Sequence, residues 1–165
     1  MFVLGIDPGL TRCGYGAVRR HGGRLRAEAA GVLTTPAGAA IPARLGELQA
    51  NLRALLAELR PDAVAVERVF FQSNVRTAMS VGQASGVAIA EAVAAGCQVV
   101  EYTPTQVKSA VTGSGSAGKE QVQRMVQSLL ALDAPPRPAD AADALALAIC
   151  HLAVAPLQAR VDAAG

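Results

Sequence analysis

The sequence predicts an α/β fold in which a mixed five-stranded sheet has helices on both of its faces. Three observations lead to this prediction. Three strand-like segments follow one another with short links at the start of the chain. Two further strand-like segments then alternate with helix-like segments. No linker, repeat or low-complexity stretch interrupts the 165 residues, so we expect a single domain over 1–165.

The first 34 residues read as three strands. Residues 2–7 (FVLGID) form a short apolar run that a Pro-Gly pair ends. Residues 13–20 form the second strand, which stops at the turn His21-Gly22-Gly23, and residues 24–34 form the third. Because the links are short, the three strands are expected to pair as an antiparallel meander.

The middle of the chain alternates helix and strand. Apolar residues recur at steps of three and four from Ile41 to Leu59, which predicts an amphipathic helix that stops at Arg60-Pro61. The segments AVAVE (63–67) and QVVEY (98–102) read as the fourth and fifth strands. Between them, residues 75–95 form a helix rich in Gly, Ala and Ser. Its small side chains favour close approach of another helix, within the chain or from a second copy.

The last third of the chain reads as helical. Thr103-Pro104-Thr105-Gln106 has the residues of a helix start, with Thr as the cap and Gln three residues later. Residues 113–116 form a flexible Gly-Ser loop. A further helix contains the apolar positions of 122–130, and the final helix runs from about 139 to 154.

Composition narrows the function classes. Hydrophobic residues make up 52% and charged residues 17%, so a buried core is expected and global disorder is not. A net charge of +2 does not suit a protein that coats DNA, so any nucleic-acid binding needs a local basic patch. Charges or glycines interrupt each apolar run, and we expect no membrane span and no signal peptide. The three unpaired cysteines suit a reducing cytoplasm.

Four carboxylates stand where buried elements end or begin. Asp7 closes the first strand, and Glu67 closes the fourth in the same way. Asp140 and Asp143 are three residues apart in an apolar stretch, so both lie on one face of the last helix. Each acid alone also fits a structural role, as a strand-end acid bonded to a turn or as a helix cap.

Taken together, the four acids favour a metal site. Two carboxylates 4 Å apart repel by roughly 4 kcal/mol at an effective dielectric of about 20. Divalent cations relieve such repulsion, and Mg²⁺ prefers oxygen ligands. Two Mg²⁺ ions roughly 3.5–4 Å apart would activate water and stabilise the leaving oxygen in hydrolysis of a phosphodiester. His21 and His151 have no visible partner in the sequence, and no phosphate-binding loop of the P-loop type is present.

Five segments carry a resemblance to a known family. They are GIDPGLTRCGYG, AVAVERVFFQSN, SVGQASGVAIAEA, YTPTQVKSAVTGSGSAGKEQVQRMV and PADAADALALAICH. With these segments the chain resembles the RuvC family of Holliday-junction endonucleases over nearly its whole length. The resemblance implies an RNase H-like fold and a magnesium-dependent endonuclease that resolves four-way DNA junctions by paired symmetric nicks in recombination and repair. The ends would carry 5′-phosphate and 3′-hydroxyl groups.

The same resemblance implies the site and the partners. Asp7, Glu67, Asp140 and Asp143 would hold two Mg²⁺ per active site, for which Mn²⁺ could substitute. The protein would act as a homodimer with the RuvA–RuvB branch-migration complex. A two-fold dimer would suit the two equivalent strands that an open junction presents.

The resemblance also implies which residues bind DNA. Thirteen of the fifteen basic residues are Arg, yet Lys108 and Lys119 stand on either side of the Gly-Ser loop. An ammonium group is a compact point charge for a phosphate. Phe70 matches a family residue that stacks on a junction base, and such stacking contributes roughly 1–3 kcal/mol. Further candidates for DNA binding are Phe71, which also fits core packing, Arg76, Ser114 and Ser116.

Three alternatives stay open at this point. The segment GIDPGLT is similar to the phosphate loop of actin-like phosphotransferases, although those need two such domains around a nucleotide. A non-catalytic junction-binding module would place four acids where they repel DNA. An RNase with the same acids is disfavoured only by the family resemblance.

Overall fold

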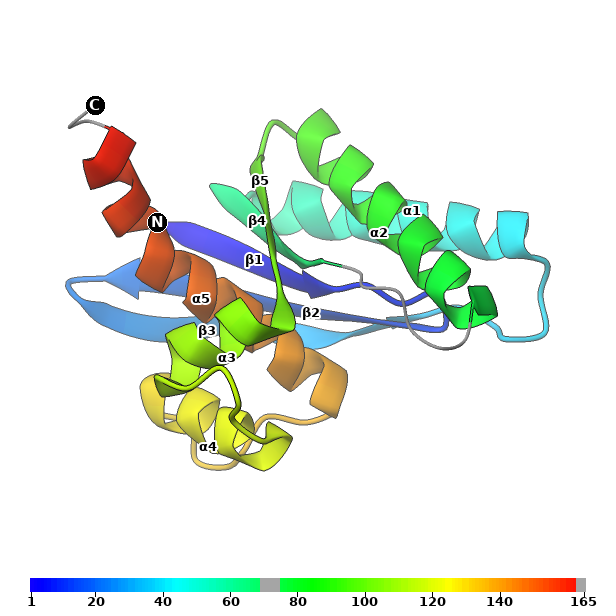
Figure 1. Ribbon diagram of the computed structural model, residues 1–165. Coiled ribbons are helices and arrows are strands. Elements are labelled where there is room, and N and C mark those ends of the chain that lie inside the picture. The colour runs from blue at the N-terminus through cyan, green and yellow to red at the C-terminus, as the bar shows by residue number, and fades with distance from the viewer. Residues whose placement is uncertain (69–74, 163–165) are drawn as a thin grey trace.

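One mixed five-stranded sheet organises the molecule (Figure 1). The structure, a computed structural model, describes residues 1–68 and 75–162. The order of the strands in the sheet is β3-β2-β1-β4-β5. The predicted meander is confirmed, because β2 pairs antiparallel with both β1 and β3, whereas β4 runs parallel to β1 and β5 parallel to β4. The strands are β1 (Phe2–Asp7), β2 (Arg12–His21), β3 (Arg24–Thr34), β4 (Ala63–Glu67) and β5 (Gln98–Tyr102).

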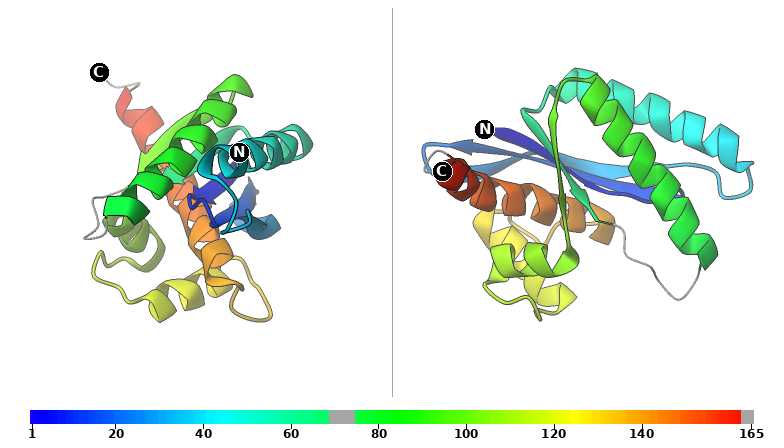
Figure 2. Two further views of the ribbon diagram at one scale, coloured as in Figure 1. Left: turned by 90° about the vertical axis from the view of Figure 1, so that its right-hand side faces the viewer. Right: turned by 45° about the horizontal axis from the view of Figure 1, so that its top comes forward.

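Helices cover both faces of this sheet, as the sequence predicts (Figures 1 and 2). Helices α1 (Ile41–Leu59) and α2 (Val75–Ala94) lie together on one face. On the other face, α5 (Ala139–Asp162) runs along β1 and β2. Helices α3 (Pro104–Thr112) and α4 (Lys119–Leu129) pack on the outer side of α5.

Alternation along β1 divides the core between the two faces. Leu4 and Ile6 are fully buried toward α1 and α2, where they meet Leu48 and Leu52. Val3 belongs to the opposite core, which α5 covers. Successive side chains of a strand point to opposite faces, so every odd position of β1 faces α5. This alternation decides which way the last residue of the strand points.

Helix α1 departs from the predicted leucine face at its first turns. Ile41 is 46% exposed, whereas Arg44 is buried. The Arg44 guanidinium donates hydrogen bonds to the hydroxyls of Thr35 at 3.0 Å and Thr11 at 2.7 Å. A buried guanidinium must satisfy its donors, and these two hydroxyls tie α1 to the turn that follows β1 and to the residue that follows β3.

Helix α5 is longer than the sequence pattern predicts. It continues to Asp162, through Pro156. Proline has no backbone N–H to donate, yet the helix extends on both sides of Pro156. The predicted end near residue 154 was therefore wrong, because a single proline did not stop the helix.

The first part of α5 is apolar enough to cross a membrane by length and composition. Over Ala139–Pro156 the mean hydropathy is 1.4 across 18 residues. The sequence expectation of no membrane span overlooked this stretch because Asp140 and Asp143 interrupt the apolar run. In the structure 61% of the stretch is buried, along the sheet, as in the core helix of a globular domain.

Candidate active site

Asp7 and Glu67 end two neighbouring parallel strands. The register pairs Ile6 with Val66, so the two acids that follow lie next to each other at the same edge of the sheet. Ile6 and Val66 face α1 and α2, and alternation therefore turns both carboxyl groups toward α5. Two acids that are 60 positions apart in the sequence thus meet because their strands pair.

Close packing of α5 on the sheet brings in the other two acids. A Cβ atom on Gly5 would lie 1.9 Å from the carbonyl oxygen of Ala144. A Cβ atom on Gly14 would lie 2.2 Å from the carbonyl oxygen of Asp140. The strands can approach the helix this closely only because they carry no side chain at these two positions. As a result the first turn of α5, with Asp140 and Asp143, lies over the end of β1.

The carboxylates of the site affect the pKa values of Asp7 and Glu67. Burial raises the pKa of Asp7 from 3.8 to about 7, and the negative charges of Glu67, Asp143 and Asp140 add to the rise. Burial also raises the pKa of Glu67, while a hydrogen bond from Asp7 and the charge of Lys119 oppose that rise. Near neutral pH the Asp7 carboxyl is therefore protonated in only part of the molecules, and when protonated it can donate a hydrogen bond to Glu67. The structure thus joins all four predicted acids in one electrostatic group.

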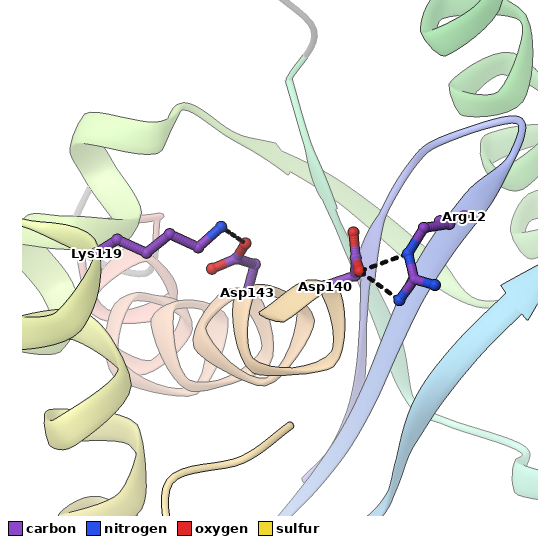
Figure 3. A network of polar contacts seen from close by, with 4 residues as sticks. All are labelled: Arg12, Lys119, Asp140 and Asp143. Atoms are coloured by element: carbon purple, nitrogen blue, oxygen red, sulfur yellow. Dashed lines mark hydrogen bonds and ion pairs between the residues drawn. The ribbon is translucent and has the colours of Figure 1, made fainter. Parts of the chain in front are cut away.

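Two basic side chains hold the acids of α5 (Figure 3). Arg12 donates from Nε and Nη2 to the same oxygen of Asp140, Oδ2, at 3.0 and 2.9 Å. Lys119 donates from Nζ to Oδ2 of Asp143 at 2.9 Å, and this hydrogen bond raises the pKa of Lys119. The two aspartates point away from each other, one toward each cation (Figure 3).

No three acidic, His or Cys side chains in residues 1–68 and 75–162 form a ready-made group for a metal ion. Arg12 and Lys119 each contact one carboxylate oxygen, Oδ2 of Asp140 and Oδ2 of Asp143. The donor set nevertheless suits Mg²⁺, because it consists of carboxylate oxygens. Burial and the neighbouring carboxylates raise the pKa of Asp7, and a bound divalent cation would oppose this rise.

A cleft of about 230 Å³ opens beside the acids. Glu67 and Asp143 line it, and so do the two lysines that the sequence singles out, Lys108 and Lys119. Both lysines therefore stand where a backbone phosphate next to the acids could be bound. This placement agrees with the predicted role of the lysines, which stays a prediction.

The other predicted DNA-binding residues have mixed outcomes. Ser114 and Ser116 lie in the loop between α3 and α4, and their hydroxyl oxygens are 3.0 Å apart. Phe70 and Phe71 lie outside the described residues. The backbone of Arg76 belongs to the first turn of α2, and its side chain also lies outside the description.

Sequence reasoning missed two features near the site. The sequence gives Arg12 no role beyond its place in a motif, because no local signal pairs it with an acid 128 positions away. His151 is buried and shares a 2.9 Å hydrogen bond between Nδ1 and the hydroxyl of Tyr102. The sequence shows no partner for His151, because Tyr102 comes from another element of the fold.

The strand order, the acids at the ends of β1 and β4, and the acids on the helix that covers them define a class of protein. This is the RNase H-like class, with an acidic site at the carboxyl edge of the sheet. Residues 3–151 match the model of the family described as "Crossover junction endodeoxyribonuclease RuvC". The chain belongs to the RuvC family.

Similar proteins cover almost the whole chain. A crossover junction endodeoxyribonuclease RuvC of Streptomyces avermitilis is 56% identical over 99% of this chain and 94% of its own length. One of Salinispora arenicola is 59% identical over 92% of this chain and 87% of its own length. The structure of Thermus thermophilus RuvC with a Holliday junction substrate has a TM-score of 0.91 at 40% identity, with 96% of both chains covered.

Proposed function

We propose that this protein resolves four-way DNA junctions by hydrolysing phosphodiester bonds at two symmetric points, in a reaction that depends on Mg²⁺. The observation that carries the proposal is the group of four acids in a member of the RuvC family, with Asp7 at its centre. The products would be nicks with a 5′-phosphate and a 3′-hydroxyl, which a ligase can seal. Such a reaction suits recombination and repair of DNA.

The metal would be held by Asp7, Glu67, Asp140 and Asp143. When two Mg²⁺ ions are bound, they supply an acidified water and neutralise charge on the leaving oxygen, and Mn²⁺ could replace them. Where the carboxyl group of Asp7 is protonated, it must then give up that proton.

The remaining site residues would position the DNA. Lys108 and Lys119 line the cleft next to Glu67 and Asp143, and their ammonium groups would bind a backbone phosphate. Ser114 and Ser116 could donate from the loop between the helices that carry the lysines. We retain Phe70 and Phe71 as candidates for base stacking and Arg76 as a candidate for phosphate binding.

We further propose that the protein works as a homodimer, as one domain over 1–165. Some small residues of α2 pack inside the chain and others lie on its open face, where a second copy could approach, and this supports the homodimer. Ala84 and Ala88 are buried within the chain, whereas a Cβ atom on Gly82 or Gly86 would meet no other atom within 4 Å. Met79 and other exposed residues extend the open side. RuvA–RuvB would be the partner complex, and the cytoplasm the place of action.

One incubation tests the proposal. A labelled four-way junction and its linear duplex are mixed with the protein, with and without Mg²⁺. We expect paired nicks at opposite positions of the junction alone, and only with the metal. An RNA–DNA hybrid in a parallel reaction tests for RNase activity. Cutting without a divalent cation, or equal cutting of the duplex, contradicts the proposal.

A substitution tests the role of the acids. Asp7→Asn should abolish cutting and leave binding of the junction measurable, because the amide keeps the shape and loses the charge. Asp133→Asn is the matched control, since Asp133 is exposed and lies outside the site. If the Asp7→Asn protein still cuts the junction, the proposed mechanism is wrong.

A further inference from the structure

Arg12 lies at the acidic site, and neither the motifs nor the family resemblance gives it a role there. It belongs to the first residues of β2, directly after the turn that follows Asp7. Two of its nitrogens donate to one oxygen of Asp140, and the other oxygen receives neither of these bonds. The Arg12 side chain is 49% exposed and that of Asp140 is 31% exposed, so solvent reaches the pair.

This ion pair competes with any cation that Asp140 would bind. The oxygen Oδ2 of Asp140 already accepts two hydrogen bonds, and the guanidinium repels a divalent cation that approaches the same carboxylate. Binding of the metal to Asp140 therefore has to weaken or break the pair with Arg12. Because the pair is partly exposed, solvent screens it and it opposes the metal only weakly.

Once released, Arg12 stays next to the reaction site with its donors free. A guanidinium offers a planar fork of N–H groups, which matches two oxygens of a phosphate. Lys119 makes the corresponding contact with Asp143, on the other side of α5 (Figure 3). The acids of α5 are thus flanked by two cations.

We propose that Arg12 alternates between two anions: Asp140 in the protein without metal, and a backbone phosphate of the DNA when divalent cations occupy the site. Arg12 would then be a DNA-binding residue whose availability depends on the metal. The phosphate part of this inference rests on the proposed function as a junction nuclease. The competition between Arg12 and the metal for Asp140 does not require DNA.

The substitution Arg12→Gln tests the inference, with Arg19→Gln as the matched control. Arg19 belongs to the same strand, is 48% exposed and also pairs with an acid, Glu28, at 3.6 Å. The two arginines are seven positions apart along the strand, which is a distance of about 23 Å. Both variants lose one positive charge, so a general effect of net charge would appear in both.

Two affinities are measured on each protein. Without DNA, calorimetric titration with Mg²⁺ should show that Arg12→Gln binds the metal about fivefold more tightly than the wild type. With Ca²⁺ present and the junction verified as uncut, fluorescence anisotropy should show about tenfold weaker binding of the junction. The dependence of this binding on salt should also fall by about one phosphate contact.

Tighter binding of Mg²⁺ together with weaker binding of the junction would identify Arg12 as a residue that alternates between Asp140 and the DNA. A residue that only stabilised the fold would weaken both affinities, and that result overturns the inference. Unchanged affinities in Arg12→Gln also overturn it, and equal changes in Arg19→Gln do the same. If the wild type cuts junctions while Arg12→Gln keeps both affinities, the inference alone fails. If the wild type does not bind the junction, the proposed function fails together with the phosphate part of the inference, whereas the Mg²⁺ titration still tests the competition for Asp140.

Discussion

Replacing Asp7 by Asn should make the metal-free protein more stable while it removes cutting. Burial and the neighbouring acids raise the pKa of Asp7 from 3.8 to about 7. The folded state therefore binds a proton that the unfolded chain releases, and the free energy of unfolding falls as pH rises through this window. Asparagine has no charge to lose, and its amide can still donate to Glu67. The variant should lack this loss of stability.

The magnitude follows from the size of the pKa rise. A rise from 3.8 to about 7 corresponds to about 4 kcal/mol when Asp7 is fully ionised. Asp7 is only partly buried and solvent screens part of the repulsion, so we expect a gain of about 2 kcal/mol at pH 8. In a chain of this size that gain raises Tm by about 4–8 °C. Near pH 4 the two proteins should differ little.

Urea and thermal unfolding in EDTA at pH 4 and pH 8 measure this difference, with Asp133→Asn as the control. Saturating Mg²⁺ should then reduce the gap at pH 8, because bound metal stabilises the wild type more than the variant. A variant no more stable than the wild type at pH 8 without metal would refute the reasoning. Burial and the neighbouring acids would then not destabilise the ionised form of Asp7 in the folded protein.

Three further predictions concern packing, pH and DNA. Gly5→Ala should lower Tm and slow cutting. The added Cβ atom would lie 1.9 Å from the Ala144 carbonyl oxygen and push α5 and its acids away from the sheet. An unchanged Tm would contradict this prediction. Burial lowers the pKa of His151 below 6.5, so the unfolded chain takes up the proton first and stability should fall as pH drops below about 6.5. Urea unfolding of His151→Gln, which can still bond to Tyr102, should lack this part of the fall. Lys119→Gln should weaken junction binding about fivefold to tenfold in anisotropy measurements and reduce its salt dependence, whereas Arg124→Gln on the same helix should change binding little.

The elements of the fold could be predicted because their signals are local. The apolar run that ends at Asp7 lies within one strand, and the apolar residues spaced three and four apart from 41 to 59 lie within one helix. The capping residues of α3 are equally local, and the structure contains the capping box with Thr103 and Gln106. The end of α5 was misjudged, because the effect of Pro156 depends on the turns around it.

The identities of the four acids were also available from the sequence, since each follows or begins a buried element. Their partners were not. The pair of Arg12 with Asp140 joins residues 128 positions apart, and the bond of Tyr102 with His151 joins residues 49 positions apart. No period or motif encodes such pairs, because they depend on which elements pack together.

The sequence alone determined which elements form and which side chains carry charge, because backbone preference and burial act over a few residues. Only the tertiary structure decided how those charges are balanced. Gly5 and Gly14 let α5 settle on the sheet, and this packing sets the acids of α5 over Asp7, with Arg12 and Lys119 beside them. Charges interact through space, so their pKa values and ion pairs are properties of the folded chain.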